Sequence, residues 1–295
     1  MNTINNTANI KPGRVQSGRV ITEGDELYYE VRGQGQPFLI IAAGEGKYYT
    51  AVADLLADEY KVTTYDRRAN GRSTMNNPQN FEISQQSRDA VAVLHAAGET
   101  SAFVFGNSAG AVIALDMAKT QPQAVRAVVA HEAPLARVLP EARKWQRFFA
   151  SIYMTAFRFS SSLATFQFML GAQLPILQLL KASGEAKKHE EVSNEPTISE
   201  KDAADVQIKL ELLPVTNYLP DVELIKQNGI KVFIAIGEWG LKKNAWYARG
   251  ARILAGRLGC ELVAFPGHHY SLIDMPNEWA VTLRRLLHQA ETANR

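Results

Sequence analysis

The chain has 295 residues, which is enough for one large domain or two of average size. Hydrophobic residues make up 46% of the sequence and charged residues 21%, so a wholly disordered or low-complexity chain is excluded. The formal net charge is only +2, from 32 Lys and Arg against 30 Asp and Glu, and this balance does not favour nucleic acid or an anionic membrane as a partner.

Strand-like and helix-like runs alternate over the first part of the chain. Residues 38–42 form a continuous apolar run, which is typical of a strand buried on both faces. Further strands are expected at 20–22, 27–31, 61–65, 102–105 and 125–130, and helices at 49–59, 84–97 and 109–119. This alternation predicts an α/β fold with a mostly parallel twisted sheet and helices on both faces.

The alternation stops between residues 135 and 219, where the sequence favours helices alone. It then returns with two strands and two helices, at 230–236, 261–265, 246–257 and 278–290. We therefore expect an α/β core in two parts, 1–134 and 220–295, interrupted by an inserted helical cap at 135–219.

The stretch between Arg158 and Lys181 contains no charged residue and is long enough to span a bilayer. Its leucines and phenylalanines recur at helical spacing, however, and leave a polar face. Gly171 and Pro175 interrupt the stretch, so two amphipathic helices are expected and no membrane contact. Since residues 1–18 are polar and lack the apolar core of a signal peptide, a cytoplasmic protein is expected.

A G-x-S-x-G pattern, Gly106 to Gly110, lies directly between the strand 102–105 and the helix that begins at Ala109. Chance alone gives this pattern in about one chain in ten of this length, so its position decides its meaning. A sharp turn from strand to helix lifts the Ser108 hydroxyl above the sheet edge and needs small neighbours. Ser108 is therefore our candidate nucleophile, and the alternative is a serine that only caps the helix.

Two further segments carry a family resemblance. Residues 65–73 are similar to a Y-D-x-R-G-x-G-x-S segment, except that Ala69 replaces its usual glycine. Residues 265–269, with Pro276 seven residues after the final histidine, are similar to a P-G-x-G-H segment. Together with the serine turn, these segments make the chain resemble the α/β-hydrolase-fold family over nearly its whole length. The resemblance implies that fold, and it makes the helical insertion the cap that usually selects the substrate.

A serine hydroxyl needs a base before it becomes a useful nucleophile. His269 is our candidate, because it follows the last expected strand and because Pro276 stands where the resemblance places a proline. His268 is the competing residue, and a structural or cap-facing role suits it better.

The resemblance leaves the acid of the triad open. Family members often place an aspartate where this chain has Gly240, after the strand 230–236. Some of them, including haloalkane dehalogenases and zearalenone-type lactonases, instead carry the acid after the preceding strand, where this chain has Glu132. Residues 131–134 are also similar to an H-E-P-P segment of uncharacterised relatives. Glu132 is therefore our candidate to orient the imidazole, with Glu238 as the alternative.

The resemblance also implies an oxyanion hole made of two backbone N–H groups. One belongs to Ala109, directly after the nucleophile, and its place at a helix N-terminus suits developing negative charge. The other belongs to Glu45, in the loop after the strand 38–42. Family members usually begin this loop with His-Gly, whereas this chain has Ala43 and Gly44.

No pattern in the sequence indicates a cofactor or a metal site. Gly46 and Lys47 lack the flanking residues of a phosphate loop, and no G-x-G-x-x-G opens a helix after a strand. His268 and His269 are adjacent and so lack metal-binding helical spacing. Cys260, the single cysteine, excludes an intrachain disulfide and a thiolate cluster.

The expected cap is rich in aromatic residues, and most of these should pack the cap against the core. A pocket between the cap and Ser108 would still be largely apolar. Candidate lining residues are Tyr48, Tyr49, Tyr153, Phe157 and Trp239. The sequence thus predicts a serine hydrolase for a small hydrophobic ester or lactone, acting through an acyl-enzyme. A C–C bond hydrolase or lyase on the same triad, and a ligand-binding or signalling protein on a hydrolase scaffold, are the alternatives.

Overall fold

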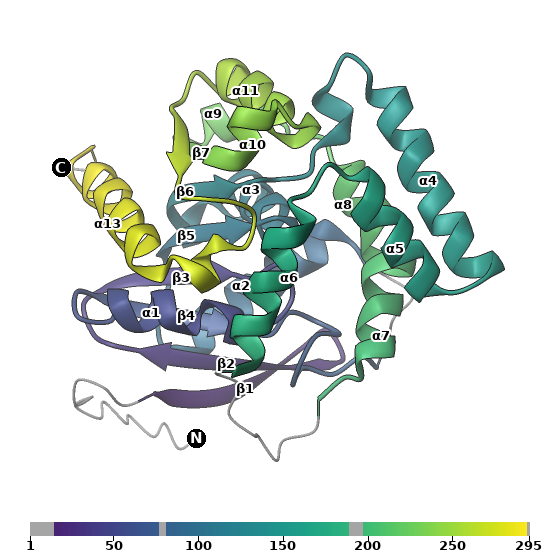
Figure 1. Ribbon diagram of the computed structural model, residues 1–295. Helices are drawn as coiled ribbons and strands as arrows, with labels where there is room; N and C mark the ends of the chain where they lie inside the picture. Colours follow the sequence, from purple (N-terminus) through teal and green to yellow (C-terminus); the bar gives the residue numbers. More distant parts are fainter. Residues whose placement is uncertain (1–14, 77–80, 189–196, 294–295) are drawn as a thin grey trace.

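The structure, a computed structural model, describes residues 15–76, 81–188 and 197–293 (Figure 1). Eight strands form one sheet: β1 (Gln16–Thr22), β2 (Asp25–Arg32), β3 (Gln36–Ile41), β4 (Tyr60–Tyr65), β5 (Ala102–Asn107), β6 (Val125–His131), β7 (Lys231–Gly237) and β8 (Leu262–Phe265). Their order in the sheet is β1-β2-β4-β3-β5-β6-β7-β8. The pairs β1–β2 and β2–β4 are antiparallel, and all other neighbours are parallel. The predicted fold class is confirmed.

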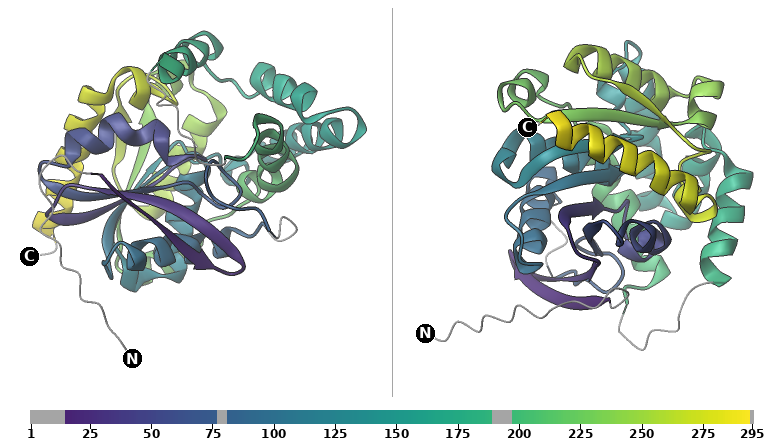
Figure 2. Two further views of the ribbon diagram at one scale, coloured as in Figure 1. Left: turned by 90° about the horizontal axis from the view of Figure 1, so that it is seen from below. Right: turned by 90° about the vertical axis from the view of Figure 1, so that its left-hand side faces the viewer.

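Two apolar cores lie on opposite faces of the sheet, because successive side chains of a strand point to opposite sides. In β3, Leu39 and Ile41 belong to one core, and Phe38 and Ile40 belong to the other. The first core is covered by α2 (Ile83–Ala96), α3 (Ala109–Thr120) and α11 (Trp246–Leu258), and the second by α1 (Thr50–Leu56) and α13 (Pro276–Ala293). Figure 2 shows α1 and α13 on one side of the twisted sheet and α2 and α3 on the other.

Three elements differ from those expected. The strands β1 and β2 are longer than expected, since all seven residues of β1 pair with β2 around a tight turn at Glu23 and Gly24. Both turn residues have positive φ, of 48° and 87°. The helix expected at 49–59 is a 3₁₀ turn, η1 (Gly46–Tyr49), followed by the shorter α1. A short helix, α10 (Glu238–Lys243), follows β7 directly and was not expected.

Between β6 and β7, the described residues contain helices and no strand. They are α4 (Ala142–Arg158), α5 (Ser161–Gly171), α6 (Ile176–Lys188), α7 (Glu200–Asp205), the π-helical segment η4 (Val206–Glu211), α8 (Leu212–Thr216) and α9 (Val222–Gln227), preceded by the 3₁₀ turn η3 (Ala136–Val138). Most of them lie beside the sheet, while α6 crosses in front of it (Figure 1).

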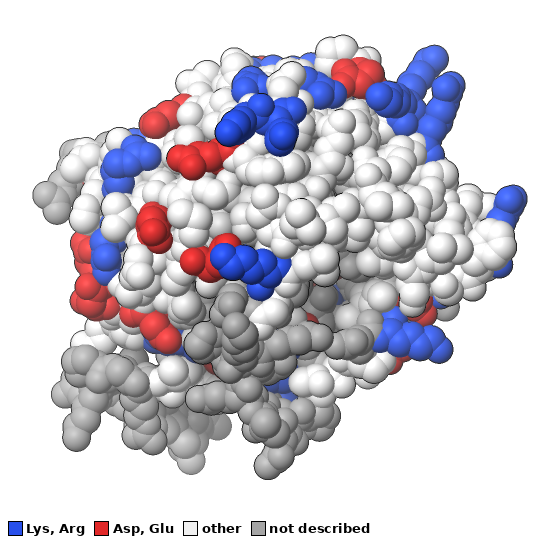
Figure 3. All heavy atoms as spheres, in the orientation of Figure 1, with Lys and Arg blue, Asp and Glu red and all other residues white. Residues whose placement is uncertain are grey.

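The uncharged stretch between Arg158 and Lys181, long enough to span a bilayer, is divided between α5 and α6. Pro175 lies immediately before α6. On α5, the side chains of Leu163, Phe166 and Leu170 are exposed along one stripe. Figure 3 shows a broad surface over α5 and α6 that carries few charged side chains. In the parts of the chain described here, no helix is long and apolar enough to cross a membrane.

Candidate active site

The turn between β5 and α3 places Ser108 in a strained conformation, with φ 56° and ψ −118°. Such backbone is rare for a residue with a side chain and collects at functional sites. The turn is tight enough that a Cβ on Gly106 would lie 2.2 Å from the Gly110 carbonyl oxygen, and one on Gly110 would lie 2.0 Å from that of Ile41. The two glycines of the pattern are therefore required by close backbone packing. Ser108 itself is half-buried at the carboxyl end of β5.

The neighbouring strand end brings Glu132 against His269. Glu132 directly follows β6, and the distance from its Oε2 to His269 Nδ1 is 2.5 Å. Its other oxygen accepts a hydrogen bond of 2.9 Å from the Gly237 N–H. Burial raises the pKa of Glu132, but the hydrogen bond from His269, the electrostatic interactions with His131 and His269 and the hydrogen bond from Gly237 together hold the pKa below its ordinary value. The carboxylate therefore stays ionised at neutral pH and can orient an imidazole.

The two competing residues lie elsewhere. Glu238 is exposed at the start of α10, and among the residues that the structure describes no hydrogen bond or ion pair joins it to His269. His268 Nε2 lies 3.4 Å from an oxygen of Asp274, on the short helix α12 (Ser271–Asp274), and its backbone N–H donates to Ser271 Oγ at 2.7 Å. His268 thus contributes to the structure of its loop.

Gly240, where relatives often carry the acid, lies beside the Glu132 carboxylate. A Cβ at Gly240 would come within 3.3 Å of Glu132 Oε1 and within 2.9 Å of the Tyr247 ring. The acid after β6 and an acid at position 240 would thus compete for one space. The space beside Glu132 thus favours a glycine at position 240.

Two hydrogen bonds tie the segments of Ser108 and His269, the candidate nucleophile and base, to neighbouring residues at one sheet edge. The Ser108 N–H donates to the His131 carbonyl at 2.9 Å, and Asn107 Nδ2 donates to the His269 carbonyl at 3.4 Å. No hydrogen bond joins Ser108 Oγ to His269, both of which the structure describes. In unliganded enzymes this contact is often long and tightens when the substrate binds.

Sequence reasoning missed the side chains beneath this edge. The carboxamide of Asn107 lies between the Tyr49 hydroxyl, at 3.0 Å from Nδ2, and His131 Nδ1, at 2.8 Å from Oδ1. Because the Asn107 oxygen can only accept, His131 carries its proton on Nδ1. The Tyr49 hydroxyl also accepts the Ala43 N–H at 3.2 Å. This network joins β5 and β6, which end next to Ser108 and Glu132, to the loop after β3.

His131 is fully buried among Phe105, Phe265 and Trp279, and its Nε2 has no hydrogen-bond partner in the part of the chain described. Burial lowers its pKa to about 4, from an ordinary value of 6.5. In the unfolded chain His131 therefore binds a proton near pH 6.5, whereas in the folded chain it does so only near pH 4. The folded chain thus loses stability relative to the unfolded chain as the pH drops through this window.

We expect the free energy of unfolding to fall by about 3 kcal/mol between pH 6.5 and pH 4 because of His131 alone. Denaturant unfolding at several pH values measures this slope, and His131→Phe is the comparison, since phenylalanine suits the aromatic surroundings and does not titrate. The free energies of unfolding of the two proteins should vary with pH in the same way above pH 7. Below pH 6.5 the wild type should lose more stability than His131→Phe. Equal slopes below pH 6.5 would show that His131 is protonated in the folded chain.

The two N–H groups expected in the oxyanion hole belong to Glu45 and Ala109. Ala109 is the first residue of α3, and Glu45 lies just before η1. For the described residues, neither N–H donates to another protein group, so both are free to bind an oxygen. The side chain of Glu45 turns to Lys47, with 2.9 Å between the carboxylate and Nζ.

The five candidate lining residues lie in different places. Tyr48 is 38% exposed in η1, whereas Tyr49, the next residue, is buried. The Tyr49 hydroxyl belongs to the hydrogen-bond network of Asn107 and Ala43. Trp239 is half-buried and lines a depression of about 280 Å³ together with His268. The rings of Tyr153 and Phe157 pack on each other at 4.7 Å on α4, where Phe157 is 58% exposed. None of the contacts described for these two α4 residues involves the sheet edge.

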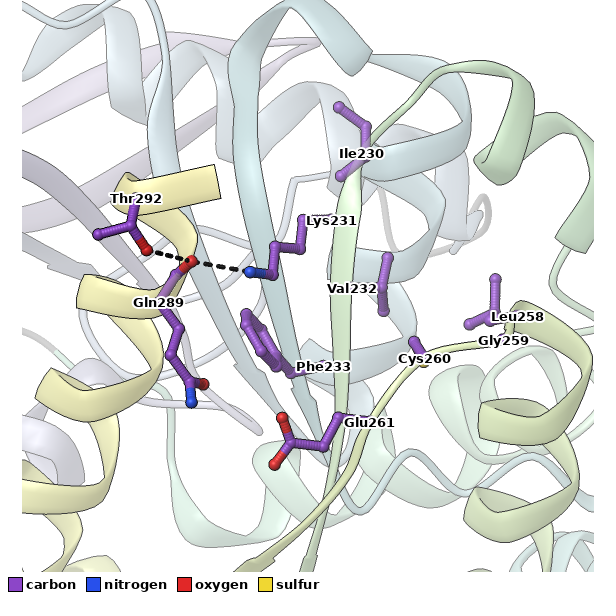
Figure 4. A pocket seen from close by; sticks show the side chains of 10 residues that line it. All are labelled: Ile230, Lys231, Val232, Phe233, Leu258, Gly259, Cys260, Glu261, Gln289 and Thr292. Carbon is purple, nitrogen blue, oxygen red and sulfur yellow. Dashed lines mark hydrogen bonds between the residues drawn. The ribbon is translucent and has the colours of Figure 1, made fainter. Parts of the chain in front are cut away.

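A larger cavity, of about 670 Å³, lies away from this edge. Figure 4 shows it at the amino ends of β7 and β8, beside α13. Its polar lining includes Lys231, whose Nζ donates to the Gln289 carbonyl at 2.7 Å. Because Ser108 stands at the opposite end of the strands, this cavity is no candidate for the active site. Over the described ranges, no three His, Cys, Asp or Glu side chains gather as metal ligands would.

Comparison with known proteins gives concordant results. Residues 36–238 match a family model described as alpha/beta hydrolase fold. The chain is 35% identical to the uncharacterized hydrolase YraK of Bacillus subtilis over 128 residues, which are 42% of this chain and 47% of YraK. The chain thus spans less than half the length of this curated relative.

Two solved structures of lower sequence identity share the fold. A thermophilic esterase from Thermogutta terrifontis has a TM-score of 0.70 at 16% identity, over 93% of this chain and 99% of that one. The enol-lactonase from Burkholderia xenovorans LB400 has a TM-score of 0.69 at 15% identity, over 92% of this chain and 100% of that one. At such identities the similarity establishes the architecture alone.

Proposed function

Because the chain belongs to the alpha/beta hydrolase fold family, we propose that it is a cofactor-independent serine hydrolase that cleaves hydrophobic carboxylic esters or lactones. The observation that carries the proposal is the meeting of three groups at one sheet edge. Ser108 occupies a strained turn after β5, and His269 bonds through Nδ1 to the buried carboxylate of Glu132 after β6. This is the arrangement that activates a serine hydroxyl.

In the first half of the reaction, Ser108 Oγ attacks the carbonyl carbon while His269 Nε2 takes the hydroxyl proton. The resulting imidazolium is stabilised by Glu132, and the negative oxygen of the tetrahedral intermediate accepts the N–H groups of Glu45 and Ala109. The intermediate then collapses as the C–O bond to the leaving group breaks, and His269 returns the proton to the departing oxygen. The product is an acyl-enzyme on Ser108.

In the second half, water attacks the acyl carbon and His269 takes its proton. The second tetrahedral intermediate releases the acid and returns the proton to Ser108 Oγ. In a lactone the leaving oxygen stays attached to the acyl chain, so the product is one hydroxy acid. No step requires a cofactor.

We assign the helices between residues 135 and 219 to a cap that forms part of the substrate pocket. The aromatic residues of these helices, with the exposed apolar stripe on α5, favour a substrate with little charge. Tyr48 and Trp239 are the lining residues that the geometry favours, since η1 and α10, which carry them, follow the carboxyl ends of β3 and β7. The structurally similar esterase and enol-lactonase are named for the hydrolysis of esters and lactones, the reaction class proposed here.

The proposal is tested by labelling the protein with a fluorophosphonate and locating the modified residue by peptide mass spectrometry. An activated serine displaces fluoride and forms an O–P bond, so we expect one label, on Ser108, and none on the folded Ser108→Ala variant. A panel of p-nitrophenyl esters and lactones then defines the substrate class. A folded protein that neither takes up the probe nor cleaves p-nitrophenyl acetate would contradict the proposal.

A further inference from the structure

We propose that Arg67 is a positioning residue for the oxyanion loop, defined here as residues 42–46, and that Glu211 holds Arg67 in place for this task. The inference rests on the proposed function, because the loop supplies the Glu45 N–H to the oxyanion. It assigns a role to a buried ion pair that the reaction itself does not use.

The oxyanion loop has few polar side chains of its own. Only Glu45 among its five residues has a polar side chain, and that one bonds to Lys47. The carbonyl groups of the loop, which is buried at both ends and half-buried between them, must therefore find donors elsewhere. A loop of alanine and glycine also has more backbone freedom than most, so its geometry depends on these outside bonds.

Arg67 supplies the donors for three successive carbonyls. Its Nε donates to the Ala42 carbonyl at 3.0 Å, and its Nη2 donates to the Ala43 carbonyl. Its backbone N–H donates to the Gly44 carbonyl, also at 3.0 Å. In a trans peptide the C=O and the following N–H point in opposite directions. Fixing the Gly44 carbonyl toward Arg67 therefore turns the Glu45 N–H away from Arg67, out of the scaffold.

The guanidinium is itself fixed by a carboxylate from the helical insertion. Glu211, the last residue of η4, accepts Arg67 Nη1 at 2.5 Å and Nη2 at 2.9 Å. The two side chains are only 1% and 7% exposed, and Gln86 accepts a further bond from Nη1. This forked pairing matches the planar guanidinium and sets its orientation, which a single charge contact would not do.

All the N–H groups of the guanidinium are thus engaged, by Ala42, Ala43, Gln86 and Glu211. None is left for a substrate, so Arg67 acts on the reaction through the position of the loop. Displacement of a catalytic group by about 1 Å costs about a hundredfold in rate, because the reacting atoms leave their productive geometry.

The next residue provides a matched control. Arg68 is equally buried and is paired with two carboxylates, Asp25 and Asp89. Its one backbone acceptor is the Thr22 carbonyl, on β1, and no bond joins its side chain to the oxyanion loop in the residues described. Changes to Arg67 and Arg68 therefore disturb similar buried ion pairs, but only the first disturbs the loop.

The test compares Arg67→Lys with Arg68→Lys in the hydrolysis of a p-nitrophenyl ester that the wild-type protein cleaves. Lysine keeps the positive charge but has only one nitrogen and lacks the planar fork. Both variants should melt at lower temperature than the wild type. We expect kcat of Arg67→Lys to fall about tenfold or more with KM changed by less than about threefold, and kcat of Arg68→Lys to stay within about threefold.

Equal kcat values for the two variants would overturn the inference while leaving the proposed function intact. If Arg67→Lys does not fold, Glu211→Gln replaces it in the test. Glutamine has the shape of glutamate but no charge, so it weakens the pairing that holds the Arg67 guanidinium. A loss of kcat by about threefold or more supports the positioning role, and an unchanged kcat overturns it. A wild-type protein that is neither labelled by fluorophosphonate nor active on esters would reject the proposed function itself, and the inference with it.

Discussion

Replacing Glu132 with glutamine is expected to lower kcat for ester hydrolysis by about 10³- to 10⁴-fold with the fold preserved. The reason lies in the second bond of the carboxylate. The Gly237 N–H donates to one oxygen of Glu132, so glutamine must place its oxygen there and its NH₂ group against His269. The amide then donates to Nδ1, so the imidazole proton must move to Nε2. With this proton bound, Nε2 can no longer take a proton from Ser108.

Steady-state kinetics of Glu132→Gln beside Glu238→Gln checks this expectation. Glu238 is the other carboxylate near the end of β7, but it is exposed, so its replacement should leave kcat within about twofold. Thermal melting of both variants verifies that they fold. A large loss in Glu238→Gln, with Glu132→Gln near wild type, would transfer the role of the acid to Glu238.

We expect that the acid can be moved to α10, the short helix that follows the neighbouring strand β7. The change Gly240→Asp, made in a Glu132→Ala background, should restore turnover by about 10- to 100-fold relative to Glu132→Ala alone. A Cβ at Gly240 lies 3.3 Å from the position of Glu132 Oε1, so an aspartate there can reach the space that Glu132 vacates. The ring of Tyr247 must shift slightly, because the new Cβ would approach it to 2.9 Å.

Two controls isolate the carboxylate in this experiment. Glu132→Ala with Gly240→Asn has the same volume without the charge and should stay as inactive as Glu132→Ala. The single change Gly240→Asp, with Glu132 still present, crowds two carboxylates in a buried site and should lower the melting temperature. Equal turnover with aspartate and asparagine at position 240 would show that this position cannot serve His269.

The sequence was sufficient for those features that short motifs determine. The pattern around Ser108 fixes a strand-turn-helix unit, and the periodicity of the flanking segments fixes the sheet on which it stands. The pairing of His269 with Glu132 joins residues 137 positions apart. It was expected only because a family resemblance pointed to both residues, since no local pattern encodes such a distance.

The supporting side chains could not be predicted in this way. Arg67 and Glu211 are 144 positions apart, and each has the appearance of an ordinary surface charge in the sequence. Their burial follows from how the helical insertion packs against the core, which periodicity does not determine. The same holds for Phe157: helical spacing puts it on one stripe with Tyr153, but it cannot say which way the stripe faces.

The pairing of Arg67 with Glu211 has a consequence for protein engineering. A designer who grafts a different insertion between β6 and β7 to change substrate preference removes the carboxylate and leaves the arginine in place. An unpartnered charge at such a site costs about 3–5 kcal/mol, a large share of the stability of a domain. Chimeras of this scaffold should therefore take residue 67 and the insertion from the same parent protein.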